Sequence, residues 1–396
     1  MNIIKREKYL EKIRPFVGKN IIKVFVGARR TGKTYILYQI IDRIKENDKE
    51  ANIIYINKEQ HEFKTITNDE NLYEYVVNKS VGEKNNYVFI DEIQEIDKFE
   101  LALRELLIKG FDIYCTGSNA KMLSSDLATH LSGRYIEIPV YGLSYSEFIE
   151  FHKLQNNKET LIKYIKYGGS PYLVNLEFDD EIIYGYLRSI YNTIILKDVV
   201  SRYNIRDVDF LERLTEYLSD SLGSYVSSKK ITDFLKSQRI SLSVNTVLNY
   251  LQYLTNSFFT DKVQRYDIQG KRIFEINDKY YFRDLGLKHS IVPYRTNDIS
   301  KIIENLIYNK LVNEGYKVFA GKLGDREIDF IATRREEKMY IQAAYLLSEE
   351  KTIEREFGNL LEINDNYRKI VVSADDFAIS DYKGVEHKNI LQFLVE

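Results

Sequence analysis

The first third of the chain alternates between unbroken apolar runs and segments with helical periodicity. Apolar runs that end at small, polar or acidic residues occur in "IIKVFVG" (21–27), "NYVFIDEIQEI" (86–96) and "FDIYCTGSNA" (111–120), and each predicts a buried strand. Between the first two, "KTYILYQIIDRIKE" (33–46) repeats apolar residues at helical spacing and predicts a helix. The pattern therefore predicts an α/β fold for the N-terminal part.

The rest of the chain changes pattern twice. Residues 142–175 and 190–205 have helical periodicity, which is broken at Gly168–Pro171. Within 206–290, two amphipathic segments precede the alternating stretch "TDKVQRYDIQGKRIFEIN" (260–277), and this order of helix, turn, helix and hairpin is typical of a winged helix. From 291 onward, a helix, a strand and a two-strand meander predict a further α/β domain.

A phosphate-binding loop is the first candidate for chemistry. Residues 24–34, "VFVGARRTGKT", fit G-x-x-x-x-G-K-[ST], and the loop lies between a predicted strand and a predicted helix. In such a loop the backbone N–H groups surround phosphates, the lysine reaches the β- and γ-phosphates, and the hydroxyl binds Mg²⁺. The alternative is a glycine-rich turn without a ligand. The nucleotide-binding residues predicted here are Gly27, Ala28, Arg29, Arg30, Thr31, Gly32, Lys33, Thr34 and Tyr35.

Hydrolysis of a bound nucleotide needs acidic and polar groups nearby. Asp91 and Glu92 follow an apolar strand, so Asp91 is predicted to hold Mg²⁺ with Thr34, and Glu92 to activate water. Ser118 and Asn119 end the next strand and are predicted to face the γ-phosphate. Arg134 begins a further strand, where it could stabilise transition-state charge in its own subunit or in a neighbour's. Solvated acids and a surface arginine are the alternatives.

The runs GARRTGKT, IDEIQ, TGSNA and LSGR together resemble the archaeal and bacterial AAA-type ATPases that carry a C-terminal domain of unknown function. The resemblance implies an ATPase core over 1–145, with a parallel sheet of order 5-1-4-3-2 built from 22–26, 53–57, 87–91, 112–116 and 135–140. It also implies a helical lid over 146–205, a winged helix over 206–290 and a last domain over 291–396. A GTPase is disfavoured, since the string nearest to N-K-x-D, "NKEQ" (57–60), lacks the aspartate.

The predicted winged helix raises the question of DNA binding. Residues 225–275 contain eight Lys or Arg and four acids, so the local charge is 8 − 4 = +4 in a chain of net charge −2. The presumed recognition helix, 243–254, contains no Lys or Arg, which leaves packing or protein contact as the alternative. The candidate DNA contacts are Lys229, Lys230, Asn245, Thr246, Asn249, Lys271 and Arg272.

The last domain looks like the restriction-endonuclease fold. Glu304 on its helix, Asp329 on one strand and Gln342 on the next match acidic and amide positions of that fold. An active enzyme of that type needs a lysine two residues after the Glu or Gln, and Ala344 stands there. Loss of one preorganised electrostatic donor lowers rates by about 10²–10³. The resemblance therefore implies a lapsed nuclease-like site that is used for binding.

Composition narrows the setting. Cys115 is the only cysteine, and no stretch approaches the roughly 18 apolar residues that a membrane span needs, so a cytoplasmic protein without membrane contact is expected. The leading interpretation is an AAA-type ATP hydrolase that uses ATP and Mg²⁺, turns over slowly, and couples nucleotide state to its C-terminal domains. The alternatives are an ATP-switched DNA-binding protein, a nucleotide-gated protein scaffold with little turnover, and a metal-dependent nuclease. Partners other than ATP would be duplex DNA or a protein. The oligomeric state is not determined by the sequence, and an oligomer is possible.

Overall fold

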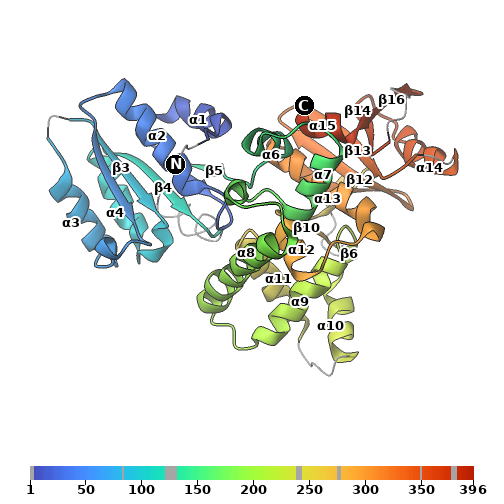
Figure 1. The fold of residues 1–396 in the computed structure, drawn as a ribbon, viewed down its shortest axis with the longest axis horizontal. Coiled ribbons are helices and arrows are strands. Elements are labelled where there is room, and N and C mark those ends of the chain that lie inside the picture. The colour runs from blue at the N-terminus through green and yellow to red at the C-terminus, as the bar shows by residue number, and fades with distance from the viewer. Residues whose placement is uncertain are drawn as a thin grey trace. The chain divides into compact units, whose positions relative to one another are not determined.

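A computed structural model describes residues 4–82, 84–120, 131, 133–237, 243–273, 278–347, 350–375 and 381–396. Ser132 of the LSGR motif, Arg239 of the charge count and the end of the predicted hairpin at 274–277 lie outside these residues. The chain forms two compact units, Met1–Tyr141 with Asn256–Phe258, and Gly142–Thr255 with Phe259–Glu396. Figure 1 traces both units along the chain, the first from blue to cyan.

The first unit is built on a five-stranded sheet in the order β2-β3-β4-β1-β5, with every neighbouring pair parallel. This is the predicted order 5-1-4-3-2 counted from the other edge, so that prediction is confirmed. The predicted strand bounds agree with the observed ones to within a residue. The strands and helices of this unit are α1 (Glu7–Ile13), β1 (Ile22–Val26), α2 (Lys33–Asn47), β2 (Asn52–Asn57), α3 (Asp69–Lys79), β3 (Asn86–Asp91), α4 (Phe99–Ile108), β4 (Asp112–Gly117) and β5 (Tyr135–Pro139).

Alternation along the buried strands divides the apolar side chains between two layers. Val24 and Val26 of β1 join the apolar cluster that contains α3 and α4. Phe25, between them, joins the cluster that contains α1 and α2. Successive side chains of a strand point to opposite faces, so α1 and α2 lie on one face of the sheet and α3 and α4 on the other. Cys115 is buried among apolar residues, as expected from the apolar run around it.

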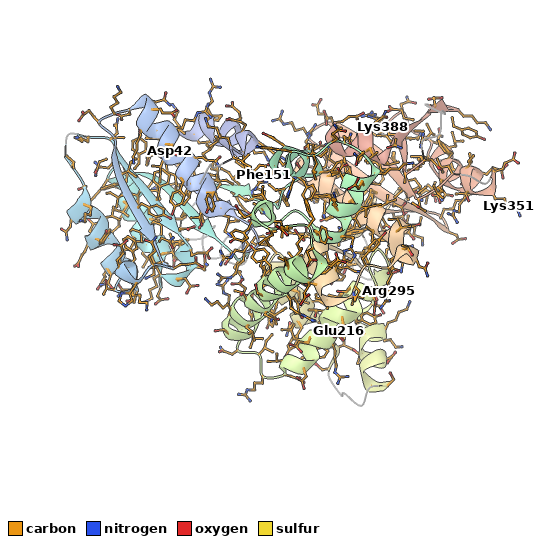
Figure 2. All side chains as sticks on the ribbon, in the orientation of Figure 1. Asp42, Phe151, Glu216, Arg295, Lys351 and Lys388 are labelled. Atoms are coloured by element: carbon orange, nitrogen blue, oxygen red, sulfur yellow. The ribbon has the colours of Figure 1, made fainter. Side chains whose placement is uncertain are left out.

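The second unit joins helices to two sheets. Figure 2 shows its side chains, with Phe151 buried on α6 and Glu216 exposed on α9. Its elements are α6 (Tyr145–His152), α7 (Lys158–Tyr167), α8 (Asp180–Thr193), α9 (Val208–Asp220), β6 (Tyr225–Val226), α10 (Ser228–Ser237), α11 (Val244–Asn256), β7 (Thr260–Val263), β8 (Arg265–Asp267), β9 (Arg272–Ile273), β10 (Asp278–Phe282), α12 (Leu285–Ile291), α13 (Ile299–Asn313), β11 (Lys317–Leu323), β12 (Arg326–Arg334), β13 (Glu337–Ala344), α14 (Glu350–Leu361), β14 (Arg368–Ser373), β15 (Asp381–Tyr382), β16 (Val385–Asn389) and α15 (Ile390–Val395).

The predicted lid, winged helix and last domain share one apolar core. One apolar cluster runs from Tyr145 through Leu254 to Leu394 and so takes in the predicted lid, winged helix and last domain. Because the three segments share a core, they form one unit, and the observed division of the chain lies at 141/142, close to the predicted 145/146.

The described part of the alternating stretch, residues 260–273, belongs to two sheets instead of forming a single hairpin. β7 and β6 both pair with β10 in a three-stranded antiparallel sheet. The short hairpin β8–β9, with Gly270 in its turn, extends the eight-stranded sheet β15-β16-β14-β13-β12-β11-β8-β9, because β8 pairs in parallel with β11. Alternation predicted the strands correctly, but it does not specify their partners.

Candidate functional site

The loop after β1 has the conformation that its glycines allow. Arg30 and Gly32 both have positive φ, 64° and 93°, and α2 begins directly after Gly32. Gly27 lies against the backbone of residue 140, and a Cβ there would come within 2.0 Å of the Val140 carbonyl oxygen. Only a residue without a side chain fits at this position. The loop therefore brings backbone N–H groups to the N-terminus of α2, which attracts anions.

Lys33 is buried inside the loop. Its Nζ donates to the carbonyl oxygens of Gly27 (3.0 Å) and Ala28 (2.9 Å), and it lies 3.8 Å from Glu92 Oε1. The Thr31 hydroxyl also donates to the Ala28 carbonyl, at 2.9 Å. The ammonium is thus held within the curve of the loop, beside Glu92, which directly follows β3.

Asp91, the last residue of β3, connects this strand to α2 and to β4. Thr34 Oγ1 at the start of α2 donates to Asp91 Oδ2 (2.7 Å), and Thr116 Oγ1 on β4 donates to Asp91 Oδ1. Burial raises the pKa of Asp91 above its ordinary value, and the two hydroxyl donors oppose this only in part. A hydroxyl and a carboxylate side by side are hard oxygen ligands, which is the donor set that Mg²⁺ prefers. The predicted metal ligands therefore lie together.

Glu92 adopts the left-handed conformation, with φ of 57°, and its N–H donates to Thr116 Oγ1 (2.9 Å). Its Oε2 accepts hydrogen bonds from Ser118 Oγ (3.1 Å) and from Gln94 Nε2. Burial alone raises the pKa of Glu92, but the charges of Lys33 and Arg29, together with the hydrogen bonds from Gln94 and Ser118, lower it and leave the pKa below its ordinary value. The carboxylate is consequently charged at neutral pH, as an acceptor of a proton from water must be.

The remaining predicted residues of this site differ in exposure. Ser118 and Asn119 are buried directly after β4, close to Glu92 in the case of Ser118. Tyr35 is 43% exposed on α2, and Arg29 forms an ion pair with Glu59 at 3.6 Å. Of the two residues predicted to face the γ-phosphate, Ser118 is therefore the one with a described hydrogen bond to Glu92.

Arg134 lies at the opposite end of the strands from the loop, just before β5, which is the strand next to β1. The residue after it, Tyr135, pairs with Ile22 at the start of β1, whereas the loop follows Val26 at the end of β1. Four residues of strand separate these points by about 13 Å. Arg134 is exposed, its carbonyl oxygen accepts from the N–H of Ile22 at the start of β1, and its own N–H donates to the carbonyl oxygen of Leu131. This register does not favour the version of the prediction in which Arg134 acts in its own subunit.

Arg6 is a residue at the loop that sequence reasoning missed. It is 4% exposed, and its Nη1 donates to the carbonyl oxygens of Thr31 (2.9 Å) and Tyr141 (3.0 Å). Its backbone N–H donates to Gln39 Oε1 on α2, at 3.0 Å. Arg6, directly before α1, therefore hydrogen-bonds the loop to α2 and to the segment after β5. Periodicity gave no signal for this contact, because Arg6 stands in an ordinary run of charged residues.

The predicted DNA-contacting residues are on or near the surface of the second unit. Lys229 and Lys230 on α10 and Asn245 and Asn249 on α11 are exposed. Thr246 is bound to the residue that caps α11, since its N–H donates to Ser243 Oγ at 3.1 Å. Lys271 and Arg272 are exposed at the β8–β9 turn, and Arg272 lies 3.8 Å from Asp267 Oδ2.

The three predicted nuclease-like residues come together with a lysine that the sequence analysis did not include. Gln342 Oε1 accepts from the N–H of Asp329 (3.3 Å). Glu304 Oε1 accepts from Lys279 Nζ (2.8 Å) and from the Tyr281 hydroxyl (2.5 Å), and both donors are on β10. β10 therefore brings a cation, Lys279, to this cluster, although Ala344 stands at the position where an active nuclease of this type needs a lysine.

Charges are crowded in this cluster. Lys279 is only 2% exposed and is paired with Glu327 Oε1 at 2.5 Å as well as with Glu304. Burial lowers the pKa of Lys279, but the carboxylates of Glu304, Asp329 and Glu327 raise it further, so that it lies above its ordinary value. Burial and the Glu304 charge raise the pKa of Asp329 well above its ordinary value. A lysine within the apolar strand "KYYF" was the signal that could have revealed the cluster.

The described residues contain neither a metal-binding cluster of side chains nor a membrane-spanning helix. No group of three or more His, Cys, Asp or Glu side chains in this part of the chain is arranged to hold a metal ion. None of the described helices has the length and apolar content that a bilayer crossing requires.

Comparisons with known proteins agree with the architecture. A model of the AAA domain matches residues 19–149, and a model of a Domain of unknown function (DUF8612) matches residues 158–298. An uncharacterized protein of Haemophilus influenzae is 33% identical over 100% of this chain and 99% of its own length. An uncharacterized protein of Methanocaldococcus jannaschii is 30% identical over 98% and 90%. A Walker-type ATPase structure from Pyrococcus abyssi shares the fold, with a TM-score of 0.51, 15% identity, and coverage of 73% of this chain and 96% of that one.

The sheet order, the glycine loop and the acidic strand end define a P-loop ATPase of the AAA type in the first unit. The chain belongs to the family that includes the Haemophilus influenzae and Methanocaldococcus jannaschii proteins, in which it is aligned nearly from end to end.

Proposed function

We propose that the protein binds Mg²⁺-ATP on residues 27–35 and hydrolyses it slowly. The observation that carries the proposal is the hydrogen-bonded arrangement of Thr34, Asp91 and Thr116 beside the buried pair of Lys33 and Glu92. Mg²⁺, when bound, would lower the charge on the phosphates and orient them. Thr34 and Asp91 would hold it, and a cradle that excludes any Cβ at Gly27 suits the close approach of a phosphate.

The residues of the chain divide the chemistry. Lys33 is proposed to leave the carbonyl groups of Gly27 and Ala28 and to contact the β- and γ-phosphates. Glu92 is proposed to accept a proton from the attacking water, since Lys33 and Arg29 keep it charged. Ser118, which contacts Glu92, and Asn119 are proposed to contact the γ-phosphate and so to respond to its loss.

Binding and turnover test this proposal separately. Lys33→Ala should abolish binding of a fluorescent ATP analogue. Glu92→Gln should keep that binding and lower kcat by about 10²–10⁴, the range for loss of a general base. Glu95→Gln is a matched control, because the same substitution is made three residues away on an exposed side chain. Wild-type protein that binds no ATP, or a Glu92→Gln variant that turns over normally, would disprove the proposal.

Arg134 is proposed to act in trans, which requires an oligomer. Arg134 lies at the end of the strands opposite to the loop and is exposed, which supports its insertion into the ATP site of a neighbouring copy. Arg134→Ala and Glu92→Gln should each be inactive alone, whereas a mixture should regain turnover, because one interface then combines an intact Glu92 with an intact Arg134. A mixture that stays inactive although the variants associate would contradict action in trans.

For the second unit we propose a winged helix and a nuclease-like fold. Both are proposed to bind a macromolecular ligand and to respond to the nucleotide state of the first unit. The helices α9, α10 and α11 with the sheet β6-β10-β7 support the first. The pairing of Lys279 with Glu304 and Glu327 supports a lapsed centre, since carboxylates neutralised by an internal ammonium are poor metal ligands.

Duplex DNA is the proposed ligand, and a protein partner in a nucleotide-gated scaffold is the alternative. The exposed Lys229, Lys230 and Lys271 support phosphate contact. Fluorescence anisotropy with a labelled duplex at two salt concentrations should show steep salt dependence. Replacing Lys229 and Lys230 by glutamine should then reduce the slope by about one for each lost phosphate contact. Affinity that ignores salt would favour the scaffold.

A further inference from the structure

Three residues from the middle of the chain are part of the ATPase unit. Asn256, the last residue of α11, and the two residues after it, Ser257 and Phe258, group with Met1–Tyr141. The residues on either side of the three, Thr255 and Phe259, belong to the second unit. Ser257 is fully buried and Phe258 is 5% exposed. The chain therefore enters the ATPase unit for three residues and leaves it again, and these residues are held there by burial.

This tripeptide contacts the segment that follows β4. The N–H of Ala120 donates to the carbonyl oxygen of Asn256 at 2.8 Å. Phe258 belongs to the apolar cluster that contains Ile113 and Cys115 of β4. Ala120 comes directly after Asn119 and two residues after Ser118, so the backbone bond lies next to both proposed γ-phosphate contacts.

Two adjacent phenylalanines divide between two cores. Phe258 is in the cluster of the ATPase unit, and Phe259 is in the large cluster of the second unit. Phe258 has φ of 59°, a left-handed conformation that costs free energy for a bulky residue and persists only where surrounding contacts enforce it. One peptide bond thus joins the core beneath the sensor segment to the core that contains α11.

We propose that Asn256–Phe258 is a positioning element for the ATPase centre. It holds residues 118–120 so that Ser118 and Asn119 face the γ-phosphate, and it transmits their displacement to α11. This rests on the proposed function, which assigns ATP to the loop. Coupling between two sites is reciprocal in binding free energy. A ligand that binds α11 must therefore change the affinity for ATP by the same factor by which ATP changes the affinity for that ligand.

Discrimination between nucleotides is the first test, and it uses the full-length chain. The positioning element should matter only where a γ-phosphate is present. Phe258→Ala should therefore lower kcat by about tenfold or more and reduce the preference for ATPγS over ADP, while ADP affinity stays within about twofold; typical coupling corresponds to 5–150-fold. Phe259→Ala is the matched control, since it removes the same side chain from the other core and should leave the ATPγS-to-ADP ratio unchanged.

A fluorescent reporter on α11 is the second test. The chain contains no tryptophan, so Leu248→Trp places a single one on the exposed face of α11, where Leu248 is 46% exposed. Its emission should differ between the ATPγS and ADP complexes, and this difference should disappear with Phe258→Ala. Phe258→Leu keeps most of the apolar volume, and Ala120→Pro removes the N–H donor, so both serve if Phe258→Ala does not fold.

The outcomes separate the two proposals. Absence of nucleotide binding in the otherwise unchanged chain overturns the proposed function itself. Normal nucleotide binding, with an unchanged ATPγS-to-ADP ratio and an unchanged reporter response in every folded variant of Phe258 and Ala120, overturns the positioning role alone. The positioning role is supported if any folded one of these variants loses both readouts while Phe259→Ala keeps an unchanged ATPγS-to-ADP ratio.

Discussion

Removal of the ammonium of Lys279 should strongly destabilise the second unit. The side chain is 2% exposed and is the cation for Glu304 and Glu327. In Lys279→Met the length of the side chain is kept, so little cavity is created, but Glu304 retains only the Tyr281 hydroxyl among the two donors described for its Oε1. Breaking a buried ion pair by removing one partner costs about 3–5 kcal/mol, because the other charge stays buried without compensation.

An ion pair with a partly exposed lysine on the neighbouring strand is the comparison. Lys262 on β7 pairs with Asp278 Oδ2 at 2.9 Å; the Lys262 side chain is 37% exposed and that of Asp278 is 11% exposed. Because solvent reaches the lysine end of this pair, Lys262→Met should cost less than Lys279→Met. In a domain of this size 1 kcal/mol changes Tm by about 2–4 °C, so Lys279→Met should lower the Tm of the second unit by about 6–20 °C.

Calorimetry or thermal melts followed by circular dichroism measure these shifts. The double variant Lys279→Met/Glu304→Gln should regain much of the lost stability, because it removes the uncompensated charge together with its former partner. A Lys279→Met variant as stable as Lys262→Met would refute the reasoning. So would a double variant that is less stable than the sum of the single changes.

Three further outcomes follow from other parts of the structure. The pKa of Asp329 is higher in the folded protein than in the unfolded chain, so its ionisation makes stability fall as pH rises above 3.8. Asp329→Asn should therefore raise Tm more at pH 8 than at pH 5, and a gain that is independent of pH would contradict the assignment. Gly27→Ala places a Cβ 2.0 Å from the Val140 carbonyl oxygen and should abolish nucleotide binding, whereas Gly82→Ala, which meets nothing within 4 Å, should not. Burial raises the pKa of the Cys115 thiol to about 12, so a thiol reagent should react with one thiol per chain only after denaturation, and rapid reaction of the native protein would be the contrary result.

The first unit could be predicted well from sequence because its signals are local. A buried strand, a glycine loop and a helix start each depend on residues within about ten positions, and the order of the motifs along the chain then limits the topology. Asp91, Glu92 and Thr34 were found in this way, and the structure brings them together. Arg134 was found by the same reasoning, but strand register does not favour action in its own subunit.

The contacts that sequence reasoning missed all join residues that are distant along the chain. Lys279 reaches Glu304 across 25 positions and Arg6 reaches Tyr141 across 135. Alternation shows which face of a strand is buried, but not which strand or helix covers it. The eight-stranded sheet, in which β8 pairs with β11, illustrates the same limit, because the strands were evident and their partners were not.

The route by which the chain joins its two units favours mechanical coupling over a passive linker. A flexible tether would cross between the units once, and movement at one end would be lost in its free rotations. Here the chain crosses at 141/142, 255/256 and 258/259, and the last two crossings enclose a segment buried in the first unit. Phe258 and Phe259 have Cα atoms about 3.8 Å apart, as any adjacent residues do. Because packed cores deform little, a displacement of Phe258 must either move Phe259 or strain the peptide bond between them. Under the proposed coupling, we therefore expect the residues on which α11 ends to respond to a rearrangement of β4.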